Sequence, residues 1–122
     1  GAGQIRATEL DKNAIPAVKD NFEKNGLSDT DFKLIMGDAV TDGEVRRKLG
    51  CDYDVVVANI LPIVLIPLTN VIRELVKPDG IIIYSGILTE KAPAVRQALM
   101  DNDFSIIKEN VLGEWCAIAA KP

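Results

Sequence analysis

The chain has 122 residues, the length of one domain, and 48% hydrophobic and 26% charged residues, which excludes a disordered chain. Its net charge of −4 and scattered Lys and Arg residues argue against nucleic-acid binding. The longest apolar stretch is interrupted by Pro62 and Pro67 and is too short to span a membrane. The sequence contains no histidine, the commonest metal ligand and general base, so we expect no metal site.

Aliphatic runs alternate with segments of helical periodicity along the chain. The expected strands are residues 5–10, 32–36, 53–58, 81–84, 104–111 and 114–120. The expected helices are residues 14–24, 41–49, 62–75 and 89–100. Residues 77–80, Lys-Pro-Asp-Gly, have the composition of a turn.

Two helix starts have recognisable caps. Asp11 or Asn13 is expected to cap the first helix, because either side chain can accept a hydrogen bond from a first-turn N–H group. Thr41 and Glu44 have the spacing of a capping box for the second helix.

The order of elements predicts the fold class. A strand followed by a helix occurs four times, which indicates right-handed βαβ units and a doubly wound, mostly parallel α/β sheet. The last two strands are separated only by the turn at Gly113, so they must form an antiparallel hairpin. We expect one domain over residues 1–122.

Asn59 is the most informative candidate residue. It follows four apolar residues, 55–58, at the end of an expected buried strand. Open α/β folds bind their ligands at the carboxyl ends of such strands. The amide could orient the lone pair of an amine toward an electrophile, or it could only satisfy the backbone of its loop.

Glu9 and Asp38 occupy similar positions at two other strand ends. Glu9 could accept hydrogen bonds from the hydroxyls of a ribose, although an exposed strand-end carboxylate is an equal alternative. Asp38 could accept the exocyclic amine of an adenine beside the backbone N–H of Ala39, or Gly37-Asp38 could be an ordinary turn.

Gly86, Trp115 and the two cysteines have weaker signals. Gly86, after Ser85, would permit close approach of a ligand or of another chain segment, or would only relax the end of a strand. We expect Trp115 and Cys116 to be buried. Neither Cys51 nor Cys116 has a nearby base or CxxC spacing, so both are expected to be reduced, unreactive thiols in a cytoplasmic protein.

Taken together, these segments resemble class I S-adenosylmethionine-dependent methyltransferases, and most narrowly the ribosomal protein L11 methyltransferase family. The combination and order of the segments are more specific than any one of them. The matching segments are ATELDKNAIPAVKDNFEKNG, the Gly37-Asp38 pair, YDVVVANIL, LVKPDGIIIYSGIL and GEWCAIAAKP.

The resemblance implies an activity and a set of roles. S-adenosylmethionine would be the cofactor, with Glu9 on its ribose, Asp38 and Ala39 at its adenine and Asn59 where the methyl group moves. Glu9 stands where the family usually has Asp. Asn59 is followed by Ile60-Leu61 and not by the Pro-Pro-aromatic sequence of enzymes that methylate planar nitrogens. This difference favours an aliphatic amine, so the implied acceptor is lysine or an α-amino nitrogen of a ribosomal protein. The resemblance implies no nucleic-acid or membrane partner.

The resemblance also implies that the family's first strand and glycine-rich cofactor loop are absent, so that residues 1–122 are a partial methyltransferase domain. We expect this chain alone to bind the cofactor weakly and to be inactive. The apolar strand edges at Ile5, Ala7, Val55 and Val57 would then associate with a second copy, or the two halves of the sheet would close directly on each other, or the chain would be ordered only as part of a longer protein. The alternatives are a non-catalytic truncated fold and a small-molecule methyltransferase.

Overall fold

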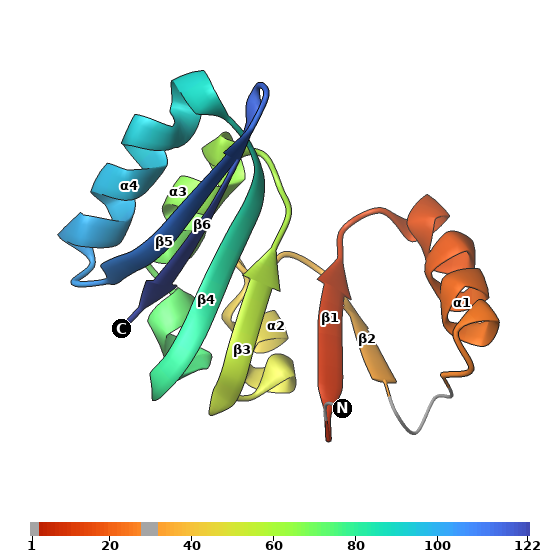
Figure 1. Ribbon diagram of the computed structural model, residues 1–122. Coiled ribbons are helices and arrows are strands. Elements are labelled where there is room, and N and C mark those ends of the chain that lie inside the picture. The colour runs from red at the N-terminus through yellow and green to blue at the C-terminus, as the bar shows by residue number, and fades with distance from the viewer. Residues whose placement is uncertain (1–2, 28–31) are drawn as a thin grey trace. The chain divides into compact units, whose positions relative to one another are not determined.

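The computed structural model describes residues 3–27 and 32–122. Its strands and helices fall into two compact units, Gly1–Gly50 and Cys51–Pro122, called here the first and second unit. Each unit is described by itself. Figure 1 shows the elements in chain order, coloured from red to blue.

The first unit is built on a parallel pair of strands, β1 (Ile5–Glu9) and β2 (Phe32–Met36). A 3₁₀ turn, η1 (Lys12–Ala14), and helix α1 (Ile15–Lys24) follow β1, close to the expected helix. Asp11 is the cap, because its side chain accepts a hydrogen bond of 2.9 Å from the backbone N–H of Asn13. The register pairs Glu9 with Met36, so the carboxyl ends of both strands are level.

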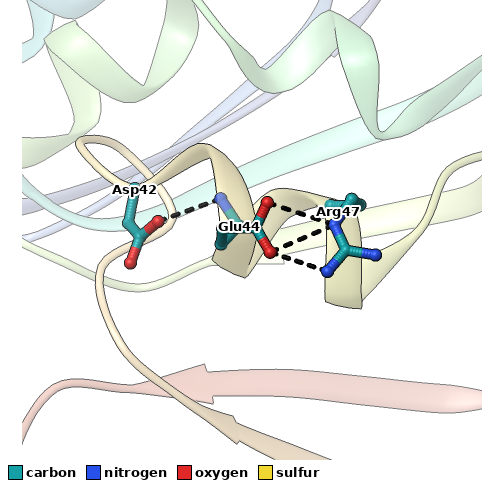
Figure 2. A network of polar contacts seen from close by, with 3 residues as sticks. All are labelled: Asp42, Glu44 and Arg47. Carbon is teal, nitrogen blue, oxygen red and sulfur yellow. Dashed lines mark hydrogen bonds and ion pairs between the residues drawn. The ribbon is translucent and has the colours of Figure 1, made fainter.

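Helix α2 (Gly43–Leu49) starts one residue later than a capping box at Thr41 would require. Asp42 is its N-cap and accepts a hydrogen bond of 2.9 Å from the backbone N–H of Glu44. The Glu44 side chain does not turn back to the cap, because it pairs with Arg47 at 2.6 Å, as Figure 2 shows. The expectation of a capping box was therefore wrong, although the helix itself was predicted.

The second unit contains a four-stranded sheet of order β3-β4-β6-β5. The pair β3–β4 is parallel, whereas β4–β6 and β5–β6 are antiparallel, which confirms the expected closing hairpin. The strands are β3 (Tyr53–Ala58), β4 (Val76–Leu88), β5 (Ser105–Leu112) and β6 (Trp115–Lys121).

Strand β4 begins five residues earlier than predicted. Tyr53 pairs with Val76 and Val55 pairs with Ile81, so the segment between Val76 and Ile81 is an irregularity inside the pairing of β3 with β4. An ion pair of 2.7 Å between Lys77 and Asp54 spans the same place. The composition of this segment predicts a turn that precedes the strand, whereas in the structure the pairing with β3 continues on both sides of it.

The predicted helix over residues 62–75 is two elements, α3 (Pro62–Thr69) and the 3₁₀ turn η2 (Ile72–Glu74). The α-helix ends at Thr69, two residues after Pro67. The N–H groups of Asn70 and Val71 then bond three residues back, to Pro67 and Leu68, which tightens the chain out of the α-helix. The remaining helical elements are η3 (Thr89–Lys91) and α4 (Ala92–Asp101).

Helices α3 and α4 pack together on one face of the four-stranded sheet (Figure 1). That covered face and its helices supply the core of the second unit, which includes Leu65, Val95, Leu99, Ile82, Tyr84, Ile118 and Ala120. The strand register places Val55, Val57 and Ile83 on the opposite face. There the side chain of Val57 is 64% exposed and that of Val55 is 51% exposed. Ile5 and Ala7 of the first unit are half-buried.

Candidate functional site

Glu9 ends β1, and its carboxylate is fixed in place by the chain that follows. Its Oε1 atom accepts hydrogen bonds from the backbone N–H groups of Leu10 at 3.0 Å and Asp11 at 3.1 Å. Within the described residues its Oε2 atom makes no hydrogen bond. Two N–H groups on one oxygen restrict the rotamer of the side chain, so the second oxygen has a defined direction for an incoming hydroxyl donor.

The loop that follows β2 carries Asp38. Its carboxylate accepts a hydrogen bond of 2.8 Å from the backbone N–H of Val40, and this bond, supported by Thr41 against a cost of desolvation, lowers the pKa of Asp38. The group is therefore a carboxylate at neutral pH and can accept hydrogen bonds. Arg46 of α2 holds the loop from the other side by donating to the carbonyl oxygens of Ala39 at 2.8 Å and Val40 at 3.0 Å.

The backbone brings Glu9 and Asp38 together. The N–H of Gly37 donates a hydrogen bond of 3.0 Å to the carbonyl oxygen of Glu9, which connects the ends of the two strands. Gly37 has φ of 137°, and a Cβ there would lie 2.5 Å from Cγ2 of Val45. A larger residue would push α2 and the Asp38 loop away from the strand ends. The first unit thus presents Glu9, Asp38 and Ala39 at one edge of its sheet.

Asn59 follows β3, as predicted, and its side chain is exposed at the carboxyl end of that strand. The next strand in the sheet, β4, reaches the same edge at Ser85-Gly86. A Cβ on Gly86 would overlap Oδ1 of Asn59 and lie 3.3 Å from its Cγ atom. The group that approaches Gly86 closely is therefore the Asn59 side chain. The sequence indicated that either a ligand or another segment of the chain could do so.

Trp115 is not buried, contrary to our expectation, whereas Cys116 is. The side chain of Trp115 is 54% exposed and that of Cys116 is 3% exposed. Trp115 pairs with Leu88 at the start of β6, and the alternation along β6 turns Cys116 and Ile118 toward the helices and Trp115 away from them. A lone tryptophan in an alternating strand indicates no face by itself, so the sequence could not decide this.

Sequence analysis did not identify the exposed apolar residues beside Asn59. Ile60, Leu61 and Ile63 are all exposed, and Leu61 and Ile63 by 68% and 78%. They follow Asn59 directly and flank Pro62, at the start of α3. Their exposure depends on the face of the helix start to which each residue belongs, which the apolar run itself does not indicate.

Neither cysteine is an activated thiol. The hydrogen bond of 3.3 Å to Asp52, together with the charge of that carboxylate, raises the pKa of Cys51. Burial raises the pKa of Cys116. Both effects favour the protonated thiol over the nucleophilic thiolate, which agrees with the prediction that neither residue performs nucleophilic catalysis.

Residues 3–27 and 32–122 form neither a metal site nor a membrane-spanning helix. In that part of the chain, no group of three or more Asp, Glu, Cys or His residues could hold a metal ion. No described helix has the length and apolarity needed to cross a membrane.

Comparisons with known proteins match the chain over its whole length. A model of the family described as ribosomal protein L11 methyltransferase covers residues 1–122. A curated protein of that name from Lachnoclostridium phytofermentans is 36% identical over 99% of this chain. The chain covers 40% of that relative, and it spans about two fifths of the length of the curated relatives it matches.

Solved structures share the fold. The ribosomal protein L11 methylase from Lactobacillus delbrueckii subsp. bulgaricus superposes with a TM-score of 0.87 at 29% identity, over 99% of this chain and 59% of that one. Fibrillarin from Aeropyrum pernix, solved with S-adenosyl-L-methionine, superposes with a TM-score of 0.77 at 17% identity, over 96% of this chain and 55% of that one. These matches confirm the Rossmann-like methyltransferase fold class, and the chain belongs to the ribosomal protein L11 methyltransferase family.

Proposed function

We propose that the protein that contains this chain transfers a methyl group from S-adenosylmethionine to lysine or an α-amino nitrogen of a ribosomal protein. Residues 1–122 contribute part of the methyltransferase domain. Membership of the family supports this function, and the name of the curated relatives supports the class of substrate. A ribosomal protein substrate implies a cytoplasmic setting.

The residues of the first unit fit the nucleoside of the cofactor. Oε2 of Glu9 can accept hydrogen bonds from ribose hydroxyls, while Oε1 stays on the Leu10 and Asp11 N–H groups. The ionised Asp38 can accept an adenine amino group, and the Ala39 N–H is adjacent to it. Fibrillarin, which has the same fold, was solved with S-adenosyl-L-methionine.

Asn59 is proposed to align the acceptor amine. When bound, the cofactor supplies an electrophilic methyl group on a positively charged sulfur. Oδ1 of Asn59 would accept one N–H of a neutral amine and so direct its lone pair, a contribution of orientation. A lysine amine has a reference pKa of ~10.4, so it must lose a proton first. The apolar side chains of Ile60, Leu61 and Ile63 favour the neutral amine once the substrate covers them.

The observation that carries the proposal is the anchored Glu9 carboxylate, tied to the Asp38 loop by the Gly37 N–H. The test compares Glu9→Ala with Asn59→Ala in the full-length protein encoded by the gene. We expect Glu9→Ala to raise the KM for S-adenosylmethionine about tenfold or more, because hydrogen bonds to a charged group contribute about 1.5–3 kcal/mol. Asn59→Ala should lower kcat about 10- to 100-fold with little change in that KM.

Matched controls are available on the surface of both units. Glu23→Ala removes an exposed carboxylate from α1, and Asn110→Ala removes an exposed amide from β5. Both should keep wild-type kinetics. Equal effects of Glu9→Ala and Asn59→Ala on KM alone would show that their roles are misassigned. Methylation of small amines but of no ribosomal protein would favour the small-molecule alternative, and no methyl transfer at all would favour the non-catalytic one.

A further inference from the structure

Gly86 lies in a β-bulge of β4, and the Asn59 side chain lies next to it. Tyr84 pairs with Ile118 of β6, and the next pair is Ile87 with Cys116, so β4 has one more residue than β6 over this interval. Gly86 has φ of 68°, the left-handed conformation that is typical of glycine in a bulge. Bulges often redirect groups next to functional sites.

The absence of a side chain at position 86 creates the space that the Asn59 amide occupies. An added Cβ would overlap Oδ1 of Asn59, lie 3.3 Å from Cγ and lie 4.0 Å from Nδ2. Contacts below 3.0 Å essentially never occur for real Cβ atoms, so the Asn59 amide, the flexible end of an exposed side chain, would have to move. No side-chain hydrogen bond of Asn59 is found within the described residues, and its Oδ1 atom lies in the space that a Cβ on Gly86 would fill.

The steric effect at Gly86 can be separated from the effect of its backbone conformation. Gly113, in the β5–β6 turn, has φ of 60°, and Gly26 after α1 has φ of 69°. A Cβ on Gly113 or Gly26 would meet nothing within 4 Å. All three positions disfavour an L side chain to a similar degree, but of these three only Gly86 contacts a candidate site residue.

We propose that Gly86 is a positioning residue for methyl transfer, because its bare backbone holds the Asn59 amide in the orientation that aligns the acceptor amine. This proposal rests on the role proposed for Asn59 above. Gly86 touches neither substrate nor cofactor in this scheme. Any side chain at position 86 would turn the amide away, and the enzyme would keep its affinity for S-adenosylmethionine while losing alignment.

The experiment compares Gly86→Ala, Gly113→Ala, Asn59→Ala and the double variant Gly86→Ala/Asn59→Ala in the full-length protein. We expect Gly86→Ala to lower kcat about 10- to 100-fold at unchanged KM for S-adenosylmethionine. Gly113→Ala has the same backbone cost of a side chain at positive φ without the clash, and it should keep the wild-type kcat. In the double variant, Gly86→Ala should cause no further loss of kcat beyond that of Asn59→Ala, because the amide it displaces is gone.

Two readouts do not depend on turnover. The ¹H–¹⁵N resonances of the Asn59 side-chain amide should shift in Gly86→Ala and not in Gly113→Ala. The loss of melting temperature caused by Gly86→Ala should be larger than that caused by Gly113→Ala, and the excess should disappear in the Asn59→Ala background. This stability cycle keeps the proposal testable if Gly86→Ala alone folds poorly.

The outcomes separate this proposal from the function it rests on. If Asn59→Ala lowers kcat while Gly86→Ala does not, or if the two effects on kcat simply add, Gly86 is not a positioning residue and the proposed function stands. If Asn59→Ala leaves kcat unchanged, the role of Asn59 is wrong and the role of Gly86 falls with it. Unshifted amide resonances in a folded Gly86→Ala variant would overturn the contact itself.

Discussion

Tyr84 and Thr69 form a buried pair of hydroxyl groups between the four-stranded sheet and α3. Their oxygen atoms are 2.9 Å apart, and Oγ1 of Thr69 also lies 2.8 Å from the carbonyl oxygen of Leu65. A carbonyl can only accept, so the single hydroxyl proton of Thr69 goes to Leu65 and the phenol of Tyr84 donates to Thr69. Both hydroxyl groups are thereby satisfied in the core.

This burial gives a prediction at the scale of one residue. Desolvation raises the pKa of Tyr84 from 10.0 to about 12, against the smaller opposing effect of the Thr69 hydrogen bond. Because the folded-state pKa is raised, the stabilisation is complete below pH 10 and is lost as the pH rises toward about 12. Relative to Tyr84→Phe, the wild type should lose about 1.4 kcal/mol of unfolding free energy between about pH 9 and about pH 11.

Urea denaturation at the two pH values measures this difference directly. Tyr53→Phe is the control, and it should keep the wild-type loss because Tyr84 is still present. Identical pH dependence in the wild type and Tyr84→Phe would show that the Tyr84 phenol is not desolvated in the folded protein.

Among the helices, α2 begins beside two adjacent residues, Thr41 and Asp42, that could each be its N-cap. Thr41 and Asp42 can both accept a hydrogen bond from a first-turn N–H group. The N–H of Asp42 bonds to the carbonyl oxygen of Asp38 at 2.9 Å, which closes a turn and places the Asp42 side chain over the N–H of Glu44. The helix therefore begins after Asp42, and Arg47 pairs with Glu44 along its exposed side.

We predict that Asp42→Ala lowers the stability of the first unit by about 1 kcal/mol, the usual contribution of an N-cap. Asp42→Asn should retain most of that stability, because an Asn side chain accepts the same hydrogen bond. Chemical denaturation, followed by circular dichroism, compares the three proteins. A destabilisation by Asp42→Asn as large as that by Asp42→Ala would mean that charge, and not the cap, stabilises the start of α2.

At the scale of the whole molecule, the two units have unequal cores. In the described part of the first unit, the buried hydrophobic residues are Ile35, Val45 and Leu49. All other buried hydrophobic residues of the described chain belong to the second unit, between Leu65 and Ala120. Because each buried aliphatic side chain contributes about 1.5–3 kcal/mol, the second unit has the larger source of stability.

Native-state hydrogen exchange should reveal this difference. Amides of β4 and β6 are expected to require an opening free energy at least about 2 kcal/mol higher than amides of β1 and β2. Val45→Ala should accelerate exchange in the first unit, and Val95→Ala in the second. Equal protection of both sheets, or equal acceleration of both by either variant, would show that the two units unfold as one.

Local sequence patterns predicted the order of the main strands and helices and the ends of the strands that precede Asp38 and Asn59. Periodicity, caps and breakers act between residues close in the chain, so β2 and β3 were predicted with the bounds that the structure has. The fold class followed, because alternation of strands and helices permits few topologies. The family to which the chain belongs is also the one that its sequence motifs resemble.

Contacts between residues distant in the chain could not be predicted from local patterns. The early start of β4 depends on its pairing with β3, and the exposure of Trp115 depends on the face of the sheet to which it belongs. The contact of Gly86 with Asn59 joins residues 27 positions apart through two neighbouring strands. Strand register and bulges determine such contacts. Register and bulges depend on hydrogen bonds between distant segments, which local sequence patterns do not specify.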